Sequence, residues 1–242
     1  MNNNILNKIL IEWNNSDFND SGILKTSDIN NRMKPQLVYK LDKPERMGIK
    51  IFDSDFEYFN KLRDKVYINN EHVKLDEEGF TVNEYNPGEY KVYIDGFDEL
   101  TNIGYSAFYH CNNLTSIVIP NLVEEIGWGA FQNCTSLTSV TLPVNSVTRI
   151  GGNAFQNCTS LTSIVIPNLV EEIGDLAFSS CTGLLEITIP VSVKTIGYGA
   201  FKNCINLKTV YVENINRFNK INFKDEDSNP IWYRAKLIEL KK

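Results

Sequence analysis

Residues 126–147 read IGWGAFQNCTSLTSVTLPVNSV, and residues 150–170 read IGGNAFQNCTSLTSIVIPNLV. Both stretches begin with isoleucine-glycine and continue through alanine-phenylalanine, a cysteine, a leucine and a proline in the same order. Five units of this kind follow one another, because isoleucine-glycine pairs begin at positions 103, 126, 150, 173 and 196. A regular period of this length indicates a repeat architecture, in which each unit forms one coil of a solenoid.

One segment of each unit has the alternating pattern of a short β-strand. In residues 114–119, LTSIVI, we expect Leu114, Ile117 and Ile119 to point inward and Val118 to point outward. The proline that follows ends the strand, because it has no N–H to donate to a ladder. A V-E-E-I piece then predicts a second short strand, and alanine-phenylalanine predicts a compact turn whose ring fills the interior.

The repeat pattern determines the fold class that we predict. A single unit does not bury its own apolar residues, whereas stacked units share a continuous core. Residues 103–212 resemble the BspA-like leucine-rich repeat family, found in bacterial and protist surface proteins and in phage-encoded proteins. The resemblance implies a mainly β fold, with a leucine-rich-repeat solenoid over residues 100–212. It also implies a small α+β or β capping module before the solenoid and a hairpin cap after it.

Residues 213–242 are predicted to form that C-terminal cap. The fifth unit has Glu213 where the pattern expects proline, which fits an atypical terminal repeat. The following segment resembles the closing element of the family, in which a last strand leads through an aromatic residue and a Ser-Asn-Pro turn into a hairpin. Here these residues are Phe218, Ser228-Asn229-Pro230, Trp232 and Tyr233.

The first hundred residues are predicted to contain two further parts. Residues 49–99 read as a small β-rich module that caps the N-terminal edge of the solenoid. Residues 1–48 are Asn-rich and are predicted to attach the protein to a larger assembly or to form an oligomer seam. An amphipathic helix over residues 4–13 would present its apolar residues to the partner or pack them on its own chain. Those residues are Ile5, Leu6, Ile9, Leu10 and Trp13.

All five cysteines occupy the same position of the repeat, at 111, 134, 158, 181 and 204. Disulfides between neighbouring coils are one reading, because Cα atoms of adjacent strands lie within bridging range. A zinc site is another, but residues spaced one coil apart form a line and not a tetrahedron. The odd number and the repeat position favour buried free thiols that act as small apolar fillers.

Outward side chains of the repeat are the candidates for ligand binding. On the strands they are Val118, Thr141, Val165, Thr188 and Tyr211, which form an almost uncharged surface. Their residue types also suit any exposed strand, so a purely structural role is an alternative. The aromatic residues Tyr105, Trp128 and Tyr198 share the position after isoleucine-glycine. They are candidate anchors or sugar-stacking platforms, or they pack on the neighbouring turn.

Charge and motifs exclude several classes of function. The net charge is −6 at pH 7, whereas nucleic-acid binding requires a basic surface. No stretch reaches the ~20 apolar residues of a membrane-spanning helix, so membrane insertion is not expected. The chain has two histidines and no phosphate-binding loop or nucleophile elbow. We therefore predict a protein that is not an enzyme and has no cofactor, metal site or catalytic residues.

These observations predict a non-enzymatic binding or adhesion protein whose partner is another protein or a cell-surface glycan. The N-terminus shows no secretory signal. This favours a virion-associated component, such as a phage head or tail decoration or receptor-binding protein, that is released by lysis. The alternative is a bacterial surface or cytoplasmic module for protein–protein interaction.

Overall fold

The structure is a computed structural model of the 242-residue chain. It describes residues 36–45, 65–69, 71–75, 81, 83–232 and 234–240. The chain divides into two units, Met1–Pro35 and Gln36–Lys242, and every described residue belongs to the second. The helix predicted for residues 4–13, with its five candidate attachment residues, lies outside the described residues.

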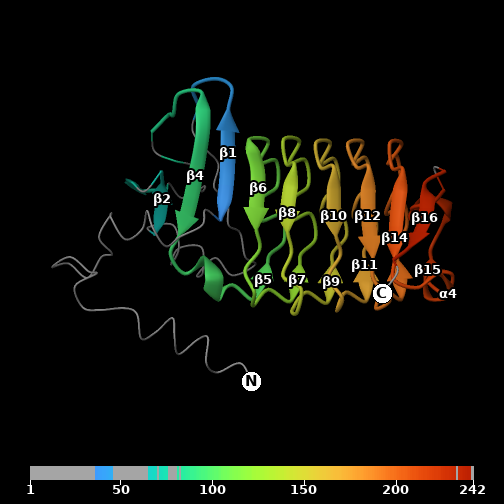
Figure 1. Ribbon diagram of the computed structural model, residues 1–242. Coiled ribbons are helices and arrows are strands. Elements are labelled where there is room, and N and C mark those ends of the chain that lie inside the picture. Colours follow the sequence, from blue (N-terminus) through green and yellow to red (C-terminus); the bar gives the residue numbers. More distant parts are fainter. Residues whose placement is uncertain are drawn as a thin grey trace. The chain divides into compact units, whose positions relative to one another are not determined.

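The described unit contains a β-solenoid in which each coil contributes one long and one short strand (Figure 1). The long strands are β6 (Leu114–Val118), β8 (Ser139–Thr141), β10 (Ser163–Val165), β12 (Glu186–Ile189), β14 (Thr209–Val212) and β16 (Lys236–Glu239). The short strands are β5 (Asn102–Ile103), β7 (Glu125–Ile126), β9 (Arg149–Ile150), β11 (Glu172–Ile173), β13 (Thr195–Ile196) and β15 (Asn222–Phe223). The mainly β solenoid predicted from the sequence is therefore confirmed.

Strands of successive coils pair in parallel and in register, because each coil returns the chain to the same position one step further on. The short strands form a single sheet in the order β15-β13-β11-β9-β7-β5. The long strands belong to two hydrogen-bonded sheets, with β6 and β8 in one and β10, β12, β14 and β16 in the other. Figure 1 shows the strands β8 and β10 side by side, so the long strands continue as one row along the solenoid.

The core between the long and short strands repeats the same side chains in every coil. Leu114, Ile117 and Ile119 are buried as predicted, while Val118 is exposed. The phenylalanines of the five repeats stack with centroid distances of 5.1–5.5 Å and interplanar angles of 4–8°. Burying each of these side chains contributes roughly 1.5–3 kcal/mol to the free energy of unfolding. The coils are therefore held together by a continuous apolar column as well as by main-chain hydrogen bonds.

The residue before each cysteine has a left-handed backbone conformation, which explains its amino-acid type. Its φ lies between 59° and 63° at His110, Asn133, Asn157, Ser180 and Asn203. Asparagine tolerates this conformation better than most residues. Its side chain also connects the coils, since the amide nitrogen of Asn157 donates to the amide oxygen of Asn133 at 2.7 Å.

Among the described residues, a cap of five elements precedes the first coil. It consists of β1 (Leu37–Leu41), β2 (Val66–Ile68), β3 (Glu71–Val73), β4 (Gly88–Ile94) and the 3₁₀ turn η2 (Phe97–Glu99). Strand β1 pairs antiparallel with β4 on one side and with β6 on the other. It lies within the segment 1–48 that we predicted for attachment, yet it covers the edge of the first long strand.

The C-terminal segment corrects the predicted hairpin and the predicted number of coils. It contains α4 (Ile215–Phe218), β15, the 3₁₀ turn η3 (Glu226–Ser228) and β16. Strand β15 pairs in parallel with β13, and β16 pairs in parallel with β14. The two strands enter different sheets, so the segment forms a sixth coil and the hairpin prediction was wrong.

The hairpin prediction failed because the main chain can follow the path of a coil without the side chains that mark the repeat in the sequence. The amide of each repeat phenylalanine donates to the alanine carbonyl of the next coil, as Phe178 does to Ala200 at 2.8 Å. In the last step Phe201 donates to the carbonyl of Asp227 at 2.9 Å. Asp227 therefore takes the place of an alanine, and no isoleucine-glycine or cysteine marks the coil in the sequence.

Candidate functional site

The five cysteines form a buried column and not a reactive site. None of the five forms a disulfide, and all are buried. Four of the thiols donate to the carbonyl of the phenylalanine in the preceding coil, at 3.0–3.2 Å; they belong to Cys134, Cys158, Cys181 and Cys204. The predicted role of the cysteines as buried free thiols is therefore confirmed.

Burial also controls the chemistry of these thiols. Desolvation raises the pKa of Cys134, Cys158 and Cys181 well above the usual range, and raises that of Cys204 to about 12. The thiolate is the nucleophile in cysteine chemistry, so these side chains are inert in the folded protein.

We expect Ellman's reagent at about pH 8 to leave the thiols of the folded protein unmodified and to titrate five per chain in concentrated guanidinium chloride. Burial raises the pKa of these thiols in the folded protein above the unfolded-state value of about 8.5. The free energy of unfolding therefore keeps the contribution of the protonated thiols below about pH 8.5 and loses it as the pH rises further. Rapid modification of the folded chain at about pH 8 would contradict the buried column.

The predicted strand residues form one row on the outward side of the long strands, which we call the sheet row. Val118 is in register with Thr141, and Val165 is in register with Thr188 and Tyr211. The two valines are 48% and 66% exposed. The structure thus brings all five predicted residues together on one surface without a charged side chain among them.

The aromatic residues lie elsewhere, after the short strands. Tyr105 and Trp128 stack with their centroids 4.9 Å apart and an interplanar angle of 7°. On the other side, a β-carbon at Gly152 would lie 3.1 Å from Cδ1 of Trp128. The indole is therefore packed between neighbouring coils, although it is 43% exposed. Tyr198 is 58% exposed and two coils beyond Gly152, so it belongs to no common stack.

The short-strand side is charged, in contrast to the sheet row. Arg149 bridges Glu125 at 3.0 Å and Glu172 at 3.4 Å, in the coils before and after its own. Lys194 pairs with Glu171 at 2.6 Å. Each exposed pair contributes about 0–1 kcal/mol, so these contacts serve solubility and register more than stability. Within the described ranges, no group of three or more potential metal ligands gathers, and no helix has the length and apolarity to cross a membrane.

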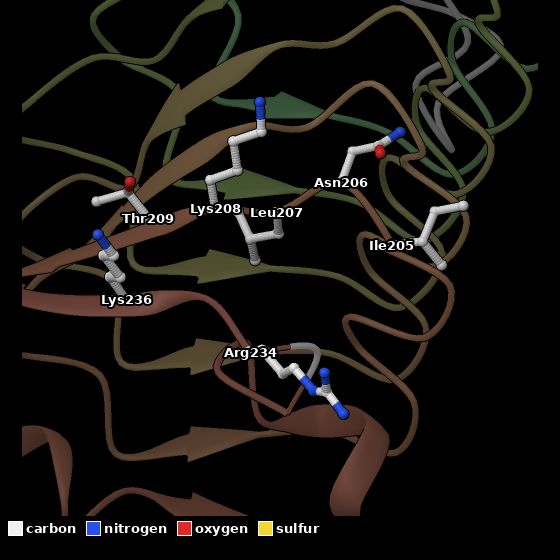
Figure 2. Close-up of a pocket in the computed structure, with 7 residues that line it drawn as sticks. All are labelled: Ile205, Asn206, Leu207, Lys208, Thr209, Arg234 and Lys236. Atoms are coloured by element: carbon white, nitrogen blue, oxygen red, sulfur yellow. The ribbon is translucent and has the colours of Figure 1, made fainter.

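Sequence reasoning missed one group of residues at the C-terminal coils. Lys208, Arg234 and Lys236 line an open cavity of about 450 Å³ together with residues 205–207 and Thr209 (Figure 2). Lys208 belongs to the fifth coil, whereas Arg234 and Lys236 belong to the sixth coil, which has no repeat signature. Only the parallel pairing of β14 with β16 brings them together, so no sequence pattern pointed to this site.

Comparison with known proteins gives matches in the repeat region. The profile of the BspA type leucine rich repeat region matches residues 101–229 in six copies, which agrees with the six coils. A comparison with curated proteins finds no match.

Among solved structures, the leucine rich repeat protein TpLRR of T. pallidum is 41% identical over 44% of this chain and 50% of its own, with a TM-score of 0.43. A leucine rich cell surface protein from Faecalibacterium prausnitzii is 35% identical over 51% of this chain and 32% of its own, with a TM-score of 0.49. A leucine-rich repeat protein from Bacteroides ovatus is 38% identical over 57% and 33%, with a TM-score of 0.46. This chain spans half or less of the length of these proteins. Because the repeat profile covers more than half of its 242 residues, the chain belongs to the BspA-type leucine-rich repeat family.

Proposed function

We propose that this protein is a non-enzymatic recognition module that binds a partner protein through the sheet row. The observation that carries the proposal is the in-register alignment of Val118 with Thr141 and of Val165 with Thr188 and Tyr211. Exposed valines flanked by hydroxyl side chains offer apolar area and hydrogen-bonding groups without the cost of desolvating a charge.

The rigidity of the scaffold supports this proposal. The inward residues of the same strands, such as Ile117 and Ile164, are buried in the continuous core. Their packing fixes the spacing of the outward side chains, so little conformational entropy is lost when a partner binds. A partner with a flat, largely uncharged surface fits this row best.

The aromatic residues give less support to a glycan partner. A sugar ring stacks on a free aromatic face, and one face of the Trp128 indole is covered by Tyr105. The other face lies against the space that Gly152 leaves open. We therefore assign Trp128 and Tyr105 to coil packing and keep the sheet row as the binding surface.

An array of cell-surface proteins and a glycan array, each probed with labelled protein, test this assignment. We expect protein signals that fall at least about tenfold for Val118→Glu/Val165→Glu, because a buried unpaired carboxylate opposes binding. The matched control is Val144→Glu/Val191→Glu, which changes two other exposed valines in the turns. Tyr105→Ala/Trp128→Ala is expected to lower thermal stability and to leave the signals unchanged. Equal losses in the sheet-row variant and its control would contradict the proposal.

The location of the protein on a virion, on a bacterial surface or in the cytoplasm stays a prediction, as does attachment through the N-terminal segment. Recognition through the sheet row depends only on described residues.

A further inference from the structure

The cavity at the C-terminal coils carries an unbalanced positive charge. Its lining contains Lys208, Arg234 and Lys236 and no acidic residue. Figure 2 shows Lys208 just before β14, Lys236 on the neighbouring strand β16, and Arg234 just before β16. The chain as a whole has a net charge of −6, so this local excess of cations runs against its overall balance.

Unlike Arg149 and Lys194, the three cavity cations form no ion pair with a described residue. Arg149 and Lys194 both pair with glutamates of neighbouring coils. On the same sheet the register places Glu186 beside Thr209 and Thr209 beside Lys236, so this exposed acid lies two strands away from Lys236. The cavity therefore favours an anionic ligand.

The last long strand adds a second requirement on that ligand. The amides of Lys236 and Leu240 donate to carbonyls of the preceding coil, at 2.7 and 2.8 Å. Because amides alternate in direction along a strand, those of Leu237 and Glu239 point away from β14. No described strand pairs with that outer edge of β16. An extended polypeptide could satisfy these groups by adding a strand.

We propose that the C-terminal coils bind an extended, carboxylate-rich segment of a partner protein. Its main chain pairs with the outer edge of β16, and its carboxylates contact Lys208, Arg234 and Lys236. Arginine binds a carboxylate through two parallel hydrogen bonds, while the lysines act as flexible point charges. The exposed side chain of Ile205 adds apolar contact at the rim of the cavity. This inference rests on the proposed function, since it gives the chemistry of a second contact with a protein partner.

The experiment uses a fluorescein-labelled peptide of about ten residues that alternates glutamate and valine, a period suited to strand addition. We expect fluorescence anisotropy to show binding to the full chain that weakens as salt is added. The variant Lys208→Gln/Arg234→Gln/Lys236→Gln should raise the Kd at least about tenfold. The matched control Lys194→Gln/Lys220→Gln/Lys224→Gln changes three exposed lysines outside the cavity and should change the Kd less than about twofold. Circular dichroism checks that both variants are folded.

Three outcomes would overturn the inference. The first is that the peptide does not bind the full chain, or that both charge variants raise its Kd equally. The second is unchanged binding of a peptide with N-methylated backbone amides, because methylation prevents strand pairing. The third is a heparin decasaccharide that binds more tightly than the peptide through the same three cations. The sheet-row variant Val118→Glu/Val165→Glu should bind the acidic peptide normally, so failure here is distinguishable from failure of the proposed function.

Discussion

Replacing Phe155 by alanine is expected to lower the free energy of unfolding by about 3–5 kcal/mol. Its ring is fully buried and stacks between Phe131 and Phe178, with both centroid distances at 5.3 Å. The substitution removes the apolar side chain and leaves a cavity in the middle of the column. It also removes two aromatic contacts, each worth about 0.5–1.5 kcal/mol beyond the burial of area.

Denaturant unfolding followed by circular dichroism measures this effect. Phe155→Leu is the matched control, because it keeps much of the apolar volume and should cost less than half as much. A loss below about 1 kcal/mol for Phe155→Ala would contradict a continuous core, since a closely packed interior does not tolerate such a cavity cheaply. Separate unfolding transitions for the N- and C-terminal coils of Phe155→Ala would agree with a continuous core, because each coil depends on its neighbours.

The second large effect is expected at Gly174, where two coils approach through their main chains. A β-carbon on Gly174 would lie 2.5 Å from the amide nitrogen of Gly152 and 2.7 Å from the carbonyl carbon of Gly151. Main-chain atoms do not rotate away as a side chain does. Gly174→Ala must therefore push the coils apart and stretch the hydrogen bond from its amide to Ile150, which is 2.8 Å long. We expect it to lower the free energy of unfolding by about 3 kcal/mol.

Gly152→Ala provides the control for this prediction, since it makes the same substitution in the neighbouring coil. Its β-carbon would lie 3.1 Å from a side-chain atom of Trp128 and 3.2 Å from the carbonyl oxygen of Asp175. Small adjustments of these atoms suffice, so we expect a loss below about 1 kcal/mol. Equal effects at the two glycines in thermal unfolding would show that the close approach of the coils at Gly174 does not limit stability.

The repeat could be predicted from the sequence because each position has one physical role in every coil. Phe155 and Cys158 recur with the period of the coil, so their burial follows from stacking alone. The sixth coil could not be predicted in this way. It follows the main-chain path of the others while Asp227 replaces an alanine, and hydrogen bonds of the backbone leave no mark in the sequence.

The cap shows a second limit of prediction. Residues 37–41, LVYKL, alternate as a strand does, but a strand pattern does not identify the strands with which it pairs. The structure places β1 between β4 and β6, partners that are far away in the chain. The basic cavity could not be predicted for the same reason, because only the pairing of β14 with β16 brings Lys208 close to Lys236. The sheet row, by contrast, follows from alternation within the repeat.

Photo-crosslinking is the most direct test of recognition through the sheet row. Benzoylphenylalanine is introduced at Val165 on the sheet row or at Thr148, which is exposed beside the short strands. Each protein is irradiated with the protein that gives the strongest array signal. We expect a crosslinked product from position 165 and none from position 148. A product from position 148 alone would contradict recognition through the sheet row, because the partner would then contact the charged side of the solenoid.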